Sequence, residues 1–147
     1  MVTRSKRMEP VLQVADGRQQ QAAQRLGQSQ QTLDERLNRL EELSSYRDEY
    51  ALHFESRSGL GMTALSARDY RLFLHRLNEA IEQQARLVET ARRELETSRG
   101  HWVEARGKTT ALNRVVEQFQ REELRQQDRR EQFEQDDRSG RVSRSIG

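Results

Sequence analysis

A mostly apolar residue recurs at alternating steps of four and three through much of the C-terminal half of this chain. These positions are Tyr70, Leu74, Leu77, Ile81, Gln84, Val88, Ala91, Leu95, Ser98, Trp102, Ala105, Thr109, Leu112, Val116 and Phe119. The residues between them are mostly Arg, Glu and Gln. A stripe with a mean period of about 3.5 residues faces another helix along its whole length. The repeat therefore predicts a long helix with a partner helix, rather than the core of a compact domain.

The N-terminal half carries a second stripe of the same kind. It comprises Leu12, Ala15, Ala22, Ala23, Leu26, Leu33, Leu37, Leu40, Leu43, Tyr46, Tyr50 and Phe54. The stripe is weakest around Gly17 and residues 19–21, where it is small and polar. It predicts a first helix over about residues 8–57, with Pro10 tolerated in its first turn.

The two stripes are separated by a short segment with two serines and two glycines, which predicts a turn over residues 58–65. Ser66, with Asp69 three residues later, resembles a capping box and predicts the start of the second helix. That helix is expected over about residues 66–137, because no proline interrupts it. Residues 138–147 are expected to form a disordered tail.

Two long stripes joined by a short turn predict an all-α, single-domain fold over residues 1–147, a long antiparallel two-helix coiled-coil hairpin with frayed termini. If Phe54 faces Tyr70, then Leu33 meets Ala91. The same register places Ala22 opposite Trp102, a small residue against the largest one. It exhausts the first helix near Val116, so Phe119, Leu124 and Phe133 are expected to overhang without a partner.

Composition limits the classes of function. Only 33% of residues are hydrophobic and 34% are charged, with acids and bases alternating to a net charge of +2, so no nucleic-acid binding is expected. The chain has no cysteine, which excludes disulfides and thiolate metal sites. No apolar run is long enough to span a bilayer, and no apolar stretch follows the basic N-terminus as in a secretory signal. We therefore expect a cytoplasmic protein without direct membrane insertion.

The sequence offers little for catalysis. The three histidines, His53, His75 and His101, lie far apart and match no metal-ligand spacing. A two-helix hairpin has no concave pocket that could desolvate an acid or exclude water. We therefore expect no enzyme activity, no catalytic residue, no metal and no cofactor.

Three features leave two interpretations each. Tyr46, Tyr50, Phe54, Tyr70 and Phe73, which are five of the eight aromatic residues, gather at the turn end. There Phe54 and Tyr70 are expected to pack the tip, whereas Tyr46 and Phe73, off the seam, suit a partner-binding surface. The overhanging helix is either solvated or orders inside a partner's cavity. The glycines inside the second helix, Gly100 and Gly107, are either tolerated defects or a flexible joint.

The segment from Leu40 to Tyr50, with the pattern L-x-x-L-x-x-Y-x-x-E-Y, is similar to a segment of the FliJ family, small coiled-coil components of the flagellar type III export apparatus. The resemblance continues after the turn in Tyr70, Phe73, Leu77, Ala80 and Ile81, and at the N-terminus in the segment from Met8 to Val14. It covers most of the chain.

This resemblance implies a fold similar to the rotor-stalk subunit of rotary ATPases. It also implies three kinds of partner: the hexameric export ATPase, the cytoplasmic linker of the export-gate membrane protein, and export chaperones. Family positions imply a gate-binding set of Leu43, Tyr46, Tyr50, Phe73, Leu77, Ala80 and Gln84. Near the two ends of the chain, which would enter the ATPase ring, the candidates are Leu12, Leu112, Val116, Phe119 and Leu124.

The resemblance thus predicts a non-enzymatic, stalk-like protein that bridges the ATPase ring and the gate and assists chaperone and substrate handling. It would be peripherally associated with the inner-membrane flagellar base. The alternative is a general coiled-coil scaffold or self-associating rod without an export role. Sedimentation distinguishes them in part, because it reports whether one chain or several form the paired helices.

Overall fold

The computed structural model describes residues 2–58 and 63–146, with the side chains of residues 2–57 and 63–142. Three helices account for nearly all of this part of the chain, namely α1 (Arg4–Arg7), α2 (Glu9–Ser58) and α3 (Ala64–Ile146). Helices α2 and α3 pack against each other as an antiparallel hairpin, which confirms the predicted fold class. The glycines of the predicted turn, Gly59 and Gly61, lie outside the described residues.

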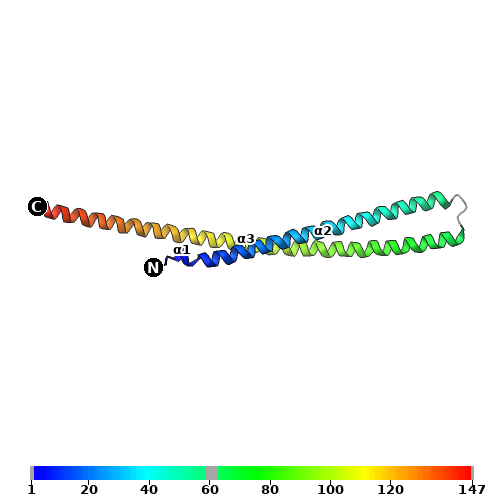
Figure 1. Ribbon diagram of the computed structural model, residues 1–147, viewed down its shortest axis with the longest axis horizontal. Coiled ribbons are helices and arrows are strands. Elements are labelled where there is room, and N and C mark those ends of the chain that lie inside the picture. The colour runs from blue at the N-terminus through cyan, green and yellow to red at the C-terminus, as the bar shows by residue number, and fades with distance from the viewer. Residues whose placement is uncertain (1, 59–62, 147) are drawn as a thin grey trace. The chain divides into compact units, whose positions relative to one another are not determined.

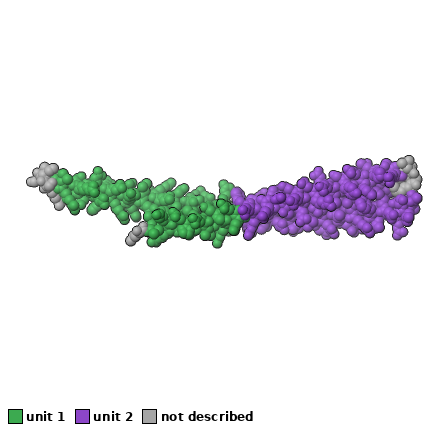
Figure 2. Space-filling model, viewed as in Figure 1, with its two compact units in different colours: residues 1–21, 103–147 green, residues 22–102 purple. Residues whose placement is uncertain are grey.

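The chain divides into two compact units (Figure 2). Unit 1 comprises residues 1–21 and 103–147, and unit 2 comprises residues 22–102. Each unit contains a stretch of α2 and a stretch of α3, so each can be described by the seam between its two stretches.

In unit 2 the seam contains the main apolar cluster of the described residues. Leu33 of α2 packs with Val88, Ala91 and Leu95 of α3, and Leu26, Leu37 and Leu40 pack against this group. The contact between the Leu33 and Ala91 levels confirms that part of the predicted register. Figure 1 shows α2 and α3 side by side over this stretch.

The predicted register also holds at both ends of the paired region. In unit 2 the rings of Phe54 and Tyr70 stack with centroids 4.0 Å apart. In unit 1 the Thr109 hydroxyl lies 3.4 Å from the Ala15 carbonyl of α2 and 3.1 Å from the Ala105 carbonyl of α3, and it shares its proton between them. Both pairs between α2 and α3 have the same sum of residue numbers, as the predicted register requires. The stripe of α3 therefore faces α2 as the 3–4 repeat indicated.

Helix α3 differs from the prediction at both of its ends. It begins at Ala64 because Thr63, not Ser66, is the N-cap: the Thr63 hydroxyl oxygen accepts a hydrogen bond from the Ser66 backbone N–H at 3.2 Å. It continues to Ile146 in place of the disordered tail expected for residues 138–147. Gly140 is the one glycine between residues 138 and 142, no proline occurs there, and one glycine does not end a helix.

The first residues also fold differently from the prediction. A short helix, α1, precedes α2, and its N-cap Thr3 accepts a hydrogen bond from the Lys6 backbone N–H at 3.3 Å. Within unit 1 this helix lies against α3, so the predicted overhang begins later than the sequence suggested. Phe119 was expected to lack a partner, but it is half-buried with the Arg4 guanidinium 5.8 Å from its ring centroid.

Candidate protein-binding surfaces

The five aromatic residues near the turn form one continuous cluster, which we call the aromatic end: Tyr46, Tyr50, Phe54, Tyr70 and Phe73. Tyr50 stands at its centre, with ring centroids 5.2 Å from Tyr70 and 4.6 Å from Phe73. Tyr46 extends the cluster, 5.7 Å from Tyr50 and 6.4 Å from Phe73. Contacts of this kind between aromatic rings hold them in a defined geometry and reduce the entropy lost on binding.

The cluster has a packed side and an exposed side. Phe54, Tyr70 and Tyr50 are half-buried, and the Tyr70 hydroxyl donates a hydrogen bond to the Tyr50 backbone carbonyl. Tyr46 and Phe73 remain exposed, at 48% and 37% of their surfaces. Both rings pack against the half-buried ring of Tyr50. Exposed rings held in place by such packing are typical of a protein-binding hot spot.

Burial of the Tyr70 phenol raises its pKa above the ordinary tyrosine value, and the nearby Tyr50 and Glu55 raise it further. The neutral phenol is therefore the form that the folded aromatic end favours. In that form it can donate to the Tyr50 carbonyl, which fixes the ring of Tyr70 against Tyr50 and Phe54.

The structure separates the predicted gate-binding residues into three groups. Tyr46 and Phe73 are exposed, whereas Leu43, Tyr50 and Ala80 are half-buried beside them. Leu77 and Gln84 are buried in the seam, at 8% exposure each. The Gln84 side chain donates to the Arg36 backbone carbonyl of α2 at 3.0 Å, so it serves the pairing of the helices.

Exposed apolar residues that the sequence assigned to no site surround this end of the hairpin. Leu52, Leu65 and Leu72 expose 67%, 71% and 50% of their surfaces. They lie off the stripes, and a search limited to the 3–4 repeat therefore passes over them. An apolar residue off the stripes lies on the outer face of a paired helix, where it packs against no partner helix. Such a position can therefore indicate a binding surface from the sequence alone.

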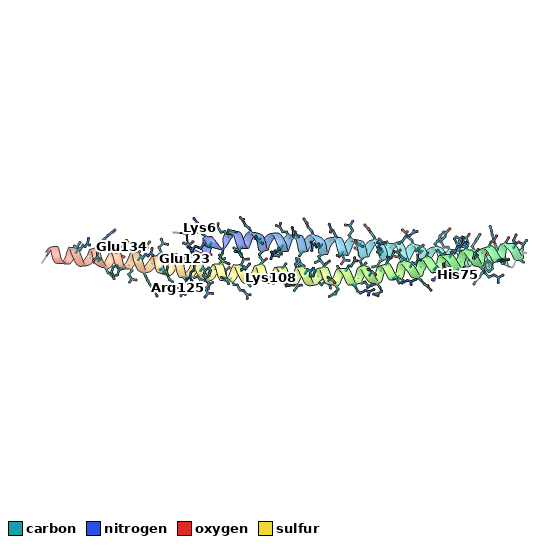
Figure 3. The ribbon with its side chains drawn as sticks, turned by 90° about the horizontal axis from the view of Figure 1, so that it is seen from below. Lys6, His75, Lys108, Glu123, Arg125 and Glu134 are labelled. Carbon is teal, nitrogen blue, oxygen red and sulfur yellow. The ribbon has the colours of Figure 1, made fainter. Side chains whose placement is uncertain are left out.

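The second candidate surface is the part of α3 that lies beyond its partner. Every described side chain from Leu124 to Val142 is exposed, including Phe133 at 76%. Figures 1 and 3 show no second helix beside this stretch, where Glu134 is labelled. We call residues 124–141 the unpaired helix.

Directly before the unpaired helix, a side chain of α3 caps the N-terminus of α1. The Glu123 carboxylate of α3 accepts two hydrogen bonds from Ser5 of α1, one from its backbone N–H at 3.0 Å and one from its hydroxyl at 2.8 Å. A carboxylate at a helix N-terminus satisfies free N–H groups and is favoured by the helix dipole. Glu123 thereby joins α3 to the N-terminal segment directly before the exposed stretch of α3 begins. The sequence analysis missed this contact.

Most of the predicted ring-binding residues belong to the seam of unit 1. Val116 is buried, and Leu12, Leu112 and Phe119 are half-buried. Only Leu124 is exposed, at 60%. A partner protein could thus reach Leu124 and Phe133 without opening the hairpin, and the same holds for exposed valines of unit 1, such as Val2, Val11, Val14, Val115 and Val142.

Charged groups on the outer faces form isolated pairs rather than a site. Arg39 pairs with Glu42 and His75 with Glu79, each at an exposed position one helical turn apart. Among the described residues, no group of three potential metal ligands gathers in one place. No helix in the described part of the chain is both long and apolar enough to cross a membrane.

The chain resembles known proteins along nearly its full length. The family model for the flagellar FliJ protein matches residues 4–145. Among solved structures, that of a proposed YscO homolog from Chlamydia trachomatis superposes with a TM-score of 0.71, at 21% sequence identity, over 98% of this chain and 96% of the other. No curated protein sequence matches the chain significantly.

Proposed function

The chain belongs to the FliJ family of flagellar proteins, and we propose that within the type III export apparatus it is a non-enzymatic stalk that bridges the export ATPase ring and the export gate. The observation that carries this proposal is the presence of two separate candidate surfaces. The aromatic end lies in unit 2 and the unpaired helix in unit 1. A bridging protein needs two sites that can be occupied together, and surfaces that share no residue meet that need.

At the gate, we propose that the cytoplasmic linker of the gate protein binds the aromatic end. Tyr46 and Phe73 supply the exposed rings, and Leu43, Tyr50 and Ala80 supply the half-buried floor. Leu77 and Gln84 contribute from within the seam, by holding α2 and α3 in the pairing that shapes this floor. Large rings on a preformed surface provide apolar area at a low cost in conformational entropy.

At the ATPase, we propose that the unpaired helix and the adjoining N-terminal segment enter the hexameric ring. A single helix is narrow enough for a central channel, and its exposed Leu124 and Phe133 would lose their contact with water there. An isolated helix is marginally stable in water, so binding would also stabilise its helical form. We further propose that export chaperones bind the paired helices, and that the protein acts in the cytoplasm at the inner-membrane flagellar base.

Binding measurements with paired variants test the bridging role. Tyr46→Ala with Phe73→Ala should weaken binding to the gate linker about tenfold or more, because truncation of hot-spot residues typically costs at least that much. The same variant should bind the ATPase as the wild type does. Leu124→Ala with Phe133→Ala should show the reverse pattern, with loss of ATPase binding and retention of gate binding.

Far-UV circular dichroism is the control for folding and should give wild-type helicity for both variants. Leu87→Ala is the matched control for an exposed apolar change outside both surfaces, and it should leave binding to both partners unchanged. If helicity falls, the rings are structural and the gate surface is misassigned. If both variants lose both partners, or neither, the two surfaces are not independent sites and the bridging proposal fails.

A further inference from the structure

Four glycines lie inside the paired parts of the long helices without any packing reason for glycine. They are Gly17 and Gly27 in α2, and Gly100 and Gly107 in α3. A Cβ atom built at any of them would have no neighbouring group within 4 Å, and none has a positive φ. Alanine would therefore fit at all four positions. Relative to alanine, each glycine lowers the equilibrium constant for helix formation at its position about fivefold. No close approach of the two backbones compensates for this loss.

These glycines lie near one another, across the two helices, in two pairs. In unit 1 Thr109 bonds the Ala15 carbonyl, so two residues further along the antiparallel pair Gly107 is level with Gly17. In unit 2 the hydroxyls of Ser29 and Ser98 are 2.7 Å apart, which places Gly27 and Gly100 within about one helical turn of each other along the pair. At two places, therefore, each helix carries a glycine within about one turn of a glycine of the other helix, so neither helix stiffens the other there.

The seam around these levels is also poor in large apolar groups. Most of the seam side chains here are small or polar, namely Ala15, Ala22 and Ser29 on α2 and Ser98, Ala105 and Thr109 on α3, and the two large ones are Leu26 and Trp102. The leucine-rich cluster around Leu33 and Leu95 begins next to this stretch, with Leu26 at its edge. Small and polar seam residues bury little apolar surface, and segments with little buried surface open at a low free-energy cost.

We propose that residues 17–27 and 100–107 form a compliant joint, at which the paired helices bend and open more readily than elsewhere in the hairpin. The division of the chain between its two compact units falls between the two glycine levels, after Gln21 and after Trp102. The joint requires no partner protein, so it does not depend on the proposed bridging role.

Amide hydrogen exchange on the full chain tests local opening. Amides of residues 17–27 and 100–107 should exchange faster than those around Leu33 and Leu95. In a variant with all four glycines replaced by alanine, exchange at these amides should slow by about fivefold or more. Gly140→Ala is the matched control, since that glycine is equally open but lies in the unpaired helix, and it should leave exchange at the joint unchanged.

Distances between spin labels test bending. Amide exchange does not, because a lower helix propensity can speed exchange without any bend in the helix pair. The chain has no cysteine, so labels attach only where cysteine is introduced. Arg92→Cys with Arg114→Cys brackets the joint on α3, and Arg71→Cys with Arg93→Cys has the same separation within unit 2; all four side chains are exposed. Each pair is roughly 33 Å apart along a straight helix.

The pair that brackets the joint should show the broader distance distribution, and the four alanines should narrow it to the width of the pair within unit 2. Equal widths in the wild-type background would overturn the proposal. A broad distribution that persists in the alanine variant would overturn it as well, because the glycines would then not be its cause.

Discussion

The buried polar side chains of the seam each bond to a backbone carbonyl or a hydroxyl of the opposite helix. Gln84 donates to the Arg36 carbonyl, and Ser29 and Ser98 bond each other. Thr109 shares its hydroxyl proton between the Ala15 carbonyl of α2 and the Ala105 carbonyl of α3. Among the described residues, no buried side-chain polar atom lacks a partner. A polar group at a seam position costs free energy if the helices shift, since the shift leaves it unpaired. These residues therefore specify the register, while the leucines supply most of the stability.

Tyr70 gives a pH-dependent prediction at this scale. Its pKa is raised in the folded chain, so the unfolded chain loses the phenol proton first as the pH rises. The contribution of Tyr70 to stability should be complete below pH 10.0 and should be lost as the pH rises above that value. Tyr70→Phe removes this dependence, so the difference in denaturation midpoint between wild type and variant should shrink above pH 10.0. A difference that stays constant through this range would contradict the assignment.

At single residues, the sequence predicted which side chains are buried better than it predicted which are accessible to a partner protein. Leu77 and Gln84 lie on the 3–4 repeat, which indicates burial, but the family resemblance placed them in a partner-binding set. The structure buries both. Exposure of Leu52, Leu65 and Leu72 could have been predicted from their position off the stripe. The contact between Ser5 and Glu123 could not, because no repeat relates a short N-terminal helix to a residue so distant in sequence.

At the level of helices, ends are decided by a few hydrogen bonds and are harder to predict than the helices themselves. Thr63 and Ser66 are both good N-cap residues, three positions apart. In the structure Thr63 caps the helix, and the first helical hydrogen bond runs from the Ala67 N–H to the Thr63 carbonyl at 3.0 Å. The stripe predicted both long helices because side-chain burial repeats along their whole length, whereas a cap occurs only once.

The cap assignment predicts the effect of two matched substitutions. Thr63→Ala should lower the free energy of unfolding by about 1 kcal/mol, since it removes the acceptor of the Ser66 N–H. For a chain of this size that corresponds to a fall of about 2–4 °C in Tm. Ser66→Ala should cost less, because it leaves that hydrogen bond in place. If Ser66→Ala lowers Tm more than Thr63→Ala does, Ser66 is the N-cap, as the sequence predicted.

For the whole molecule, the structure accounts for a hairpin formed by one copy of the chain. The seam of α3 is filled by α2 of the same chain at the levels of Phe54, Leu33 and Ala15. No partner chain is needed to cover those residues. The register could be predicted from the sequence because one stripe is nearly continuous and the turn between the stripes is short.

Dilution of labelled protein tests this intramolecular pairing. Asp34→Cys with Arg92→Cys places two exposed labels beside the Leu33 cluster. Helices in contact have axes about 8–10 Å apart, so the label distance should be short and should not change on dilution with unlabelled chain. Sedimentation should report the mass of one chain, 17.3 kDa. A distance that lengthens on dilution, or twice that mass, would support the self-associating rod instead.

The aromatic residues also provide a set of natural optical reporters. All three tyrosines belong to the aromatic end, whereas Trp102, the sole tryptophan, is the last α3 residue of unit 2, beside the glycine levels. Tyr70 and Trp102 are roughly 48 Å apart along α3, which is too far for efficient excitation transfer between them. Tyrosine emission therefore reports on one end of unit 2 and tryptophan emission on the other. Unlabelled protein can show by fluorescence which end melts first on heating, and which responds when a partner is added.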